Sequence, residues 1–352
     1  MKDILYKVIK DFDRGNMLVR LLDFPLQIED AKRIGEEVFL PKYRNFKKIL
    51  FSGLGGSAIG GDLVRSYLYL KSPLPIFVNR EYILPSFVDN QTLVFICSYS
   101  GNTEETISSY REAKKKNAKI IVISSGGVLK DLAKKDKIPH IQIPSGFPPR
   151  SALGYLSITP LVILNRLIPI KDLDEEIEES ILILENLKEE LKPEISTPKN
   201  QGKRIAFFLF KKFVITYSTS LNFDCCAIRF RAQIAENSKQ LGSVNLFPEL
   251  NHNEIEGFRN PKFLSKDFVV LILRGRGEPL NIKKRIEITK RIIEGEKIKI
   301  KEVFSRGKGL LAKIFSLIYS CDFISFYLAI LNEIDPTPVE KIGYLKKELT
   351  KR

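Results

Sequence analysis

The chain of 352 residues is long for one hydrophobic core and comfortable for two. Its 44% hydrophobic and 28% charged residues are typical of a globular protein, and we find no apolar run of the roughly 18 residues that a membrane span needs. Residues 1–5 lack the apolar centre of a signal peptide, so we expect a cytoplasmic protein with no membrane partner.

The net charge of +15 comes from 57 Lys and Arg residues against 42 Asp and Glu residues. Such a balance first suggests a nucleic-acid-binding protein. The basic residues are, however, spread over amphipathic segments such as 111–116 and 283–291, without a basic-aromatic RNA motif or a helix-turn-helix. We therefore expect no nucleic-acid partner and favour a solvated surface rich in Lys and Glu, whose field would attract a small anionic substrate.

In chain order, residues 1–40 are predicted to form a helical lead-in that packs on the first sheet. Short apolar runs then alternate with amphipathic segments, and this alternation predicts a parallel sheet with helices on both faces. The predicted strands of this part are 49–52, 76–78, 93–97, 120–124 and 140–143, and a helix is predicted over 103–116.

A second α/β region is predicted after the helices 151–168 and 172–191. Pro193, Pro198 and Gly202 interrupt the pattern, so we place a boundary near 195–203. The alternation then restarts, with strands at 205–209, 269–273 and 298–303 and helices at 227–241, 281–294 and 310–332. The sequence therefore predicts two doubly wound, parallel-sheet α/β domains, 1–195 and 203–352.

A glycine-rich segment, FSGLGGSAIGGD at 51–62, links the first predicted strand to a helix. Glycines let the backbone approach a ligand closely, and the N–H groups at a helix N-terminus suit an anion. A dinucleotide site is the main alternative. The spacing from Gly53 does not follow GxGxxG, and no acidic residue about 20 positions on completes a ribose site. We therefore favour a phosphate near Gly56 and Ser57.

A second polar segment, SYSGNTEET at 98–106, follows another predicted strand of the same sheet. The hydroxyls of Ser98, Ser100 and Thr103 can donate hydrogen bonds to phosphate oxygens. The alternative is that Asn102 or Thr103 only caps the next helix. Because open α/β sheets bind ligands at the carboxyl ends of their strands, we favour the phosphate site.

Both segments resemble the phosphosugar-binding segments of sugar isomerase (SIS) domains. Four further segments are similar to those of bifunctional phosphoglucose/phosphomannose isomerases, in the same order: PSGFPPRSALGY at 144–155, ENSK at 236–239, NHNEI at 251–255 and DPTPV at 335–339. This resemblance implies two SIS domains and a homodimer with sites shared between subunits. It also implies interconversion of glucose 6-phosphate, and of mannose 6-phosphate, with fructose 6-phosphate.

The resemblance assigns phosphate binding to Ser57, Ser98, Ser100 and Thr103, and sugar chemistry to Glu236 and Arg150. Isomerising an aldose to a ketose requires one base that moves a proton between C2 and C1, and a carboxylate with a tuned pKa suits this task. Glu236 is the expected base. Arg150, in a loop stiffened by two prolines, is expected to stabilise the enediolate.

Ring opening requires a proton shuttle near neutral pH, a task that suits the imidazole of His252. Its neighbours Asn251 and Glu254 could orient the ring. The resemblance adds a lysine from the last helix, for which we choose Lys346. Two other lysines compete for this role: Lys341 and Lys347.

We expect no metal and no cofactor, because two distant histidines and scattered cysteines do not form a zinc site. The other histidine, His140, opens a predicted strand and is expected to be structural. The cysteines form no CxxC pair and are expected to be free, buried and inert: Cys97, Cys225, Cys226 and Cys321.

Two alternatives remain. An amidotransferase that makes glucosamine 6-phosphate needs an N-terminal Cys nucleophile, but the first cysteine here is Cys97. A non-catalytic sugar-phosphate sensor would keep the hydroxyl cluster but would not need Arg150, Glu236 and His252 together. Formation of fructose 6-phosphate distinguishes the sensor from the isomerase.

Overall fold

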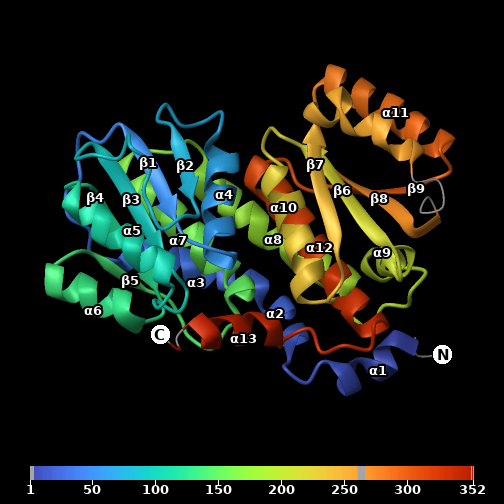
Figure 1. Ribbon diagram of the computed structural model, residues 1–352, viewed down its shortest axis with the longest axis horizontal. Coiled ribbons are helices and arrows are strands. Elements are labelled where there is room, and N and C mark those ends of the chain that lie inside the picture. The colour runs from blue at the N-terminus through green and yellow to red at the C-terminus, as the bar shows by residue number, and fades with distance from the viewer. Residues whose placement is uncertain (1–3, 261–265, 350, 352) are drawn as a thin grey trace. The chain divides into compact units, whose positions relative to one another are not determined.

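The computed structural model describes residues 4–260, 266–349 and 351. The chain forms two compact units, which are drawn in Figure 1. The N-terminal unit comprises Asp23–Ile183 and Gly307–Ile314. The C-terminal unit comprises the described residues of Met1–Leu22, Leu184–Arg306 and Phe315–Arg352.

The N-terminal unit contains a parallel sheet with the strand order β2-β1-β3-β4-β5. Strand β3 is buried along its whole length, which explains its uninterrupted apolar run. The elements are α3 (Phe24–Glu37), β1 (Lys48–Ser52), α4 (Gly56–Leu68), β2 (Ile76–Asn79), β3 (Thr92–Cys97), α5 (Glu104–Lys115), β4 (Lys119–Ser124), α6 (Gly127–Asp136), β5 (His140–Gln142), the 3-10 helix η1 (Pro149–Ser151), α7 (Leu153–Leu167) and α8 (Leu173–Leu191).

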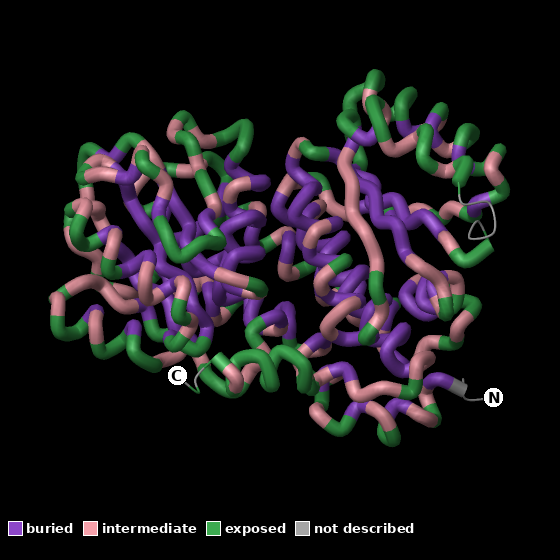
Figure 2. Tube along the Cα trace, viewed as in Figure 1, coloured by how far each residue is buried: buried purple, intermediate pink, exposed green. Residues whose placement is uncertain are grey.

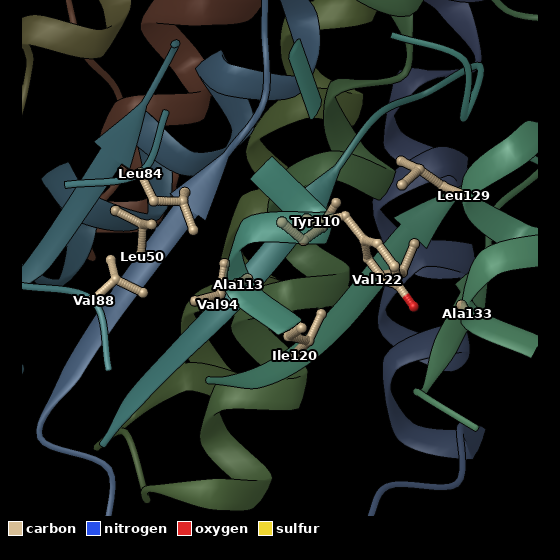
Figure 3. Close-up of a cluster of buried hydrophobic side chains, with 11 residues drawn as sticks. Leu50, Leu84, Val88, Val94, Tyr110, Ala113, Ile120, Val122, Leu129 and Ala133 are labelled. Atoms are coloured by element: carbon tan, nitrogen blue, oxygen red, sulfur yellow. The ribbon is translucent and has the colours of Figure 1, made fainter. Parts of the chain in front are cut away.

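Helices cover both faces of this sheet. On one face, shown in Figure 3, alternate strand residues such as Leu50 and Val122 pack against Tyr110 of α5. On the other face, the rings of Phe51 and Phe95 stack with their centroids 4.8 Å apart. Helix α4 lies directly against this second face, because a Cβ atom at Gly61 would be only 2.6 Å from the Phe51 Cβ. The predicted arrangement of a sheet between two helical layers is confirmed.

The C-terminal unit contains a second parallel sheet with the order β7-β6-β8-β9. Ile215 and Ile272 of its strands pack against Ile286 and Ile293 of a covering helix, α11. The elements are α1 (Ile4–Phe12), α2 (Met17–Leu22), α9 (Gln201–Leu209), β6 (Phe213–Thr219), α10 (Asp224–Glu236), β7 (Gly242–Phe247), the 3-10 helices η2 (Glu249–His252) and η3 (Glu254–Arg259), β8 (Phe268–Arg274), α11 (Leu280–Gly295), β9 (Lys299–Phe304), α12 (Leu310–Leu331) and α13 (Glu340–Leu349).

Helix α12 is long and apolar enough to cross a bilayer, contrary to our expectation that no segment meets this criterion. However, 94% of its most apolar 18 residues are buried inside the fold (Figure 2). Length and composition do not separate the core helix of a globular protein from a membrane span, whereas this burial does. Helix α12 is a core helix.

Two predicted elements of the second region are wrong, and two strands were missed. The strand predicted at 205–209 is the helix α9, whose first turn is capped by the Asn200 side chain, which accepts a hydrogen bond from the Lys203 N–H at 3.0 Å. The strands β6 and β7 were not predicted, and the helix predicted to reach residue 241 ends at Glu236. A five-residue apolar run does not distinguish a strand from a short helix, and here the capping residue decides.

The compact units do not coincide with the predicted domains 1–195 and 203–352, and the helical lead-in is divided between them. The first two helices belong to the C-terminal unit, where the Tyr319 hydroxyl donates to the Leu21 carbonyl at 2.9 Å. The end of α8 belongs there too, where the buried Asn200 Nδ2 donates to the Leu191 carbonyl at 2.9 Å. The boundary between the units therefore follows tertiary contacts, which the local composition near 195–203 does not reveal.

Candidate active site

The hydroxyl cluster of the N-terminal unit lies at the carboxyl ends of β1 and β3. The chain leaves β1 toward β2 and leaves β3 toward β4, on opposite sides, so the two connections diverge at the switch point where sheets of this kind bind ligands. The Ser57 Oγ accepts a hydrogen bond from the Tyr99 N–H at 3.0 Å. The Ser98 Oγ donates to the Thr103 Oγ1 at 2.9 Å. The two polar segments thus meet at one point.

The capping alternative does not describe this cluster. Thr103 precedes α5, but its side chain makes no capping hydrogen bond, and its hydroxyl accepts from Ser98 instead. The Asn102 Oδ1 accepts from the Val128 N–H at 2.9 Å and so links the segment to α6. The exposed Ser100 Oγ accepts from the Asn102 N–H at 3.2 Å. These contacts organise the loop within itself and against α6.

The glycines of the first segment allow close packing. A Cβ atom at Gly60 would lie 2.1 Å from the Leu156 carbonyl oxygen of α7, and one at Gly56 would lie 2.6 Å from the Pro149 carbonyl oxygen. Only glycine permits these approaches. The contact at Gly56 brings η1, and with it the buried Arg150, next to the start of α4. Arg150 and the hydroxyl cluster therefore belong to one region of the N-terminal unit.

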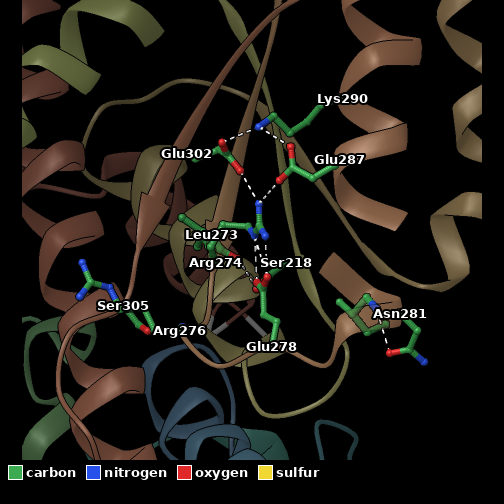
Figure 4. A network of polar contacts seen from close by, with 11 residues as sticks. Ser218, Leu273, Arg274, Arg276, Glu278, Asn281, Glu287, Lys290, Glu302 and Ser305 are labelled. Carbon is green, nitrogen blue, oxygen red and sulfur yellow. Dashed lines mark hydrogen bonds and ion pairs between the residues drawn. The ribbon is translucent and has the colours of Figure 1, made fainter. Parts of the chain in front are cut away.

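The corresponding point of the second sheet, at the ends of β6 and β8, has different chemistry. Buried Arg274 ends β8 and is surrounded by carboxylates, as Figure 4 shows. Glu278 accepts from its Nε and Nη2 at 2.9 and 2.6 Å, and Glu287 and Glu302 accept from its Nη1 at 3.1 and 2.5 Å. The charge of the arginine is thus neutralised within the fold, and the Ser218 hydroxyl at the end of β6 donates to the Leu273 carbonyl at 3.0 Å.

Glu236 is the last residue of α10, and the buried side of this helix is attached to α12 by polar contacts. The buried Arg229 donates to the two carboxylate oxygens of Asp322 at 3.2 and 2.7 Å, and the Gln233 Nε2 donates to the same carboxylate at 2.9 Å. Beyond the helix, the Asn237 Nδ2 donates to the Ser325 Oγ at 2.9 Å. These directional contacts fix the rotation of α10, and with it the direction of the half-buried Glu236.

His252 ends η2 and is exposed, but the two neighbours expected to orient its ring bind other groups. The Asn251 Nδ2 donates to the Thr289 Oγ1 of α11 at 2.7 Å. The Glu254 carboxylate accepts from the Tyr217 hydroxyl at 2.6 Å. Burial, followed by the bond to this carboxylate, raises the pKa of Tyr217 well above its usual value. Both neighbours anchor the loop to the sheet and α11, and the imidazole is presented outward.

The three competing lysines, Lys341, Lys346 and Lys347, all lie on α13 and are all exposed. His140 is half-buried in the N-terminal unit, with its Nε2 at 2.8 Å from the Ser124 Oγ. Burial lowers its pKa, as expected for a structural histidine.

The cysteines are free and buried, as predicted. Burial raises the pKa of the Cys97 thiol to about 12, so this thiol is not a nucleophile at neutral pH. Within residues 4–260, 266–349 and 351, no group of three or more His, Cys, Asp or Glu side chains is arranged to hold a metal ion.

The predicted site residues fall into two groups, one in each unit. The N-terminal unit holds the phosphate-binding candidates and Arg150, and the C-terminal unit holds Glu236, His252 and Lys346. Asp322 was not among the predicted residues. A lone carboxylate inside an otherwise apolar helix was the signal that could have identified it, because such a group is rarely buried without a partner.

Comparisons with known proteins agree with this architecture. Residues 42–142 match the model of the SIS domain, and residues 198–349 match that of the bacterial phospho-glucose isomerase C-terminal SIS domain. A hypothetical protein of Thermus thermophilus has the same fold, with a TM-score of 0.75 at 15% identity over 99% of this chain and 94% of its own. The chain is thus a protein of two SIS domains.

Two relatives of known name identify the family within the proteins of two SIS domains. A bifunctional phosphoglucose/phosphomannose isomerase of Caldicellulosiruptor bescii is 44% identical over 95% of this chain and 98% of its own length. One of Aquifex aeolicus is 37% identical over 87% and 91%. The chain belongs to the family of bifunctional phosphoglucose/phosphomannose isomerases and is an enzyme of that family.

Proposed function

We propose that the enzyme interconverts glucose 6-phosphate and mannose 6-phosphate with fructose 6-phosphate through an enediol intermediate. The observation that carries this proposal is the meeting of Ser57, Ser98 and Thr103 at the point where the strand connections of the N-terminal sheet diverge. Hydroxyls and helix N-terminal N–H groups at this point suit a phosphate group. The C-terminal unit supplies the titratable groups that a sensor would not need.

The residue roles follow from the chemistry of each step. Glu236 takes the proton from C2 and returns it to C1, and Arg150 stabilises the negative charge of the enediolate, a task that requires no metal ion. His252 and Lys346 open the sugar ring by moving a proton between the ring oxygen and O1. The enediol is common to glucose 6-phosphate and mannose 6-phosphate, since C2 is planar in it, and this accounts for action on both epimers.

The active form in this proposal is a cytoplasmic homodimer in which His252 completes the partner's site. Two observations support an active site that is shared between the two subunits. His252 is exposed, while its neighbours anchor the loop. No residue of α13 is buried, although the helix carries large apolar side chains, as expected of a helix that is covered by a second subunit. These exposed side chains are Ile342, Tyr344, Leu345 and Leu349.

The decisive experiment replaces the proposed base. Glu236→Gln keeps the size and much of the hydrogen bonding of the side chain but removes its basicity. General-base catalysis is worth roughly 10²–10⁴ in rate, so we expect kcat to fall by about that factor. The wild type in deuterated water should incorporate deuterium at C2 of recovered substrate, and the variant should not. A rate above about a tenth of the wild-type rate would exclude Glu236 as the base.

Glu296→Gln is the matched control, because Glu296 is also a half-buried glutamate at a helix end and lies after α11. It should retain full activity. If the wild type isomerises no hexose 6-phosphate, the sensor alternative is supported instead.

A further inference from the structure

Lys239 lies in the turn after α10, three residues beyond Glu236, with a left-handed backbone φ of 52°. Its ammonium is surrounded by backbone carbonyls from two separate segments. The Nζ lies 2.6 Å from the Glu236 carbonyl oxygen and 2.7 Å from that of Pro338. Three further carbonyl oxygens lie within 3.5 Å: Asp335 at 3.2 Å, Pro336 at 3.4 Å and Asn237 at 3.5 Å.

This geometry uses all the donors of the side chain. An ammonium has three N–H groups, which match the three shortest contacts, to Glu236, Asp335 and Pro338. The first of these carbonyls belongs to the C-terminal end of α10, where carbonyls lack helical partners and the helix dipole favours a cation. The other two belong to the segment that connects α12 to α13. One ammonium thus joins the end of the helix that carries Glu236 to the lead-in of the helix that carries Lys346.

A second contact strengthens the same junction. The Asn332 Nδ2, at the end of α12, donates to the Ser238 carbonyl at 3.1 Å and lies 3.3 Å from the Gln240 Oε1. The turn that contains Lys239 is therefore held from both sides.

Such binding is not general for lysines at helix ends in this chain. Lys297 follows α11 in the same way, is exposed and has a φ of 64°. No hydrogen bond or ion pair of its ammonium is found in the described part of the chain. The left-handed turn alone therefore does not explain the contacts of Lys239.

We propose that Lys239 is a positioning residue for the catalytic base. This inference rests on the proposed role of Glu236. One carboxylate must reach both C1 and C2, so its position relative to the two carbons determines the rate, and a displacement of about 1 Å can cost about a hundredfold. Lys239 holds the backbone of Glu236 in place, and with it the carboxylate. It acts without contacting the substrate.

The test is Lys239→Asn with Lys297→Asn as the matched control. Asparagine tolerates the left-handed backbone, so the turn is kept and only the ammonium is removed. For Lys239→Asn we expect kcat to fall about 10- to 100-fold, with KM changed by less than about threefold. Glucose 6-phosphate carrying deuterium at C2 supplies a second readout. The fraction of label transferred to C1, instead of lost to water, should fall, because a displaced base holds the proton less well between the two carbons.

The outcomes of these measurements distinguish the positioning role of Lys239 from the role of Glu236 as the base. Unchanged kcat and unchanged transfer in Lys239→Asn overturn the inference, as does an equal effect in Lys297→Asn. A loss of activity with an unchanged transfer fraction also overturns it, since it indicates a purely structural role. If Lys239→Asn does not fold, Lys239→Arg gives the readout. The planar guanidinium cannot reproduce the three directions of an ammonium, so a transfer fraction equal to the wild type would overturn the inference. An active Glu236→Gln variant would instead refute the role of the base itself.

Discussion

At the residue scale, the hydroxyls of Ser57, Ser98 and Thr103 form the phosphate site that we propose. Ser57 and Ser98 are buried, yet each forms its hydrogen bond within the loops that diverge from β1 and β3. A hydroxyl rotates freely, so Ser98 can donate to Thr103 or to a phosphate oxygen without a change of backbone. We therefore expect these hydroxyls to matter more for binding sugar phosphate than for folding.

Replacement of Ser98 and Thr103 by Ala tests this distinction. Hydrogen bonds to a charged group are worth about 1.5–3 kcal/mol, so we expect sugar-phosphate affinity to fall at least about tenfold, while stability changes by about 1 kcal/mol. Calorimetric titration with fructose 6-phosphate and thermal unfolding measure the two effects. Ser72→Ala is the control, since its hydroxyl serves only a turn, donating to the Leu74 carbonyl at 2.9 Å. Unchanged affinity in the double variant would place the phosphate elsewhere.

At the scale of elements, α10 and α12 are joined by a buried ion pair that holds the helix of Glu236 in place. Both side chains are 4% exposed, and the pair is bidentate, with the Gln233 amide as an additional donor. A buried pair contributes little net stability relative to apolar residues, but it is costly to break because one charge is left uncompensated. We infer that the Arg229–Asp322 pair provides orientation more than stability.

Asp322→Ala should therefore lower the free energy of unfolding by about 3–5 kcal/mol. The double variant Arg229→Met/Asp322→Leu should lose less, because no charge remains buried, yet its kcat should fall as α10 loses its fixed rotation. Urea unfolding followed by circular dichroism, together with isomerase assays, measures both quantities. Breaking the exposed pair of Arg306 and Glu190 should change stability by less than about 1 kcal/mol. Equal losses in the single and double variants would contradict this interpretation.

At the scale of the whole molecule, the functional groups are distributed over two units and, in our proposal, over two subunits. The apolar side chains on α13 and the outward His252 are features that a second copy would cover or use. In an isologous dimer the same contact occurs twice, so each site would take one histidine from its partner.

Mixing an inactive Glu236→Gln variant with an inactive His252→Ala variant tests this sharing. Random exchange of subunits makes about half of the dimers hybrids, and each hybrid would contain one intact site, so about a quarter of the wild-type activity should return. Light scattering and mass spectrometry verify the dimer and the exchange. Each variant incubated alone should stay inactive. Verified exchange without recovery would place Glu236 and His252 in a site of one subunit.

The sequence by itself determined the parallel α/β class and the location of the two polar segments that we propose bind phosphate. Strands buried on both faces must be continuously apolar, as 93–97 and 120–123 are, and ligand-binding loops follow such strands. The similarity of the later segments predicts Glu236, His252 and Arg150 as the residues of sugar chemistry, and these roles remain proposals.

Only the tertiary structure decided the rest. Residues 205–209 form a helix because Asn200 caps them, the first two helices join the C-terminal unit through α12, and Asp322 is tolerated in an apolar helix because Arg229 lies opposite. Lys239 gains its contacts from a segment about a hundred residues further along the chain. The Asn200 cap is a local signal that the apolar run outweighed, whereas the other three outcomes depend on partners distant in sequence, which local pattern and propensity do not specify.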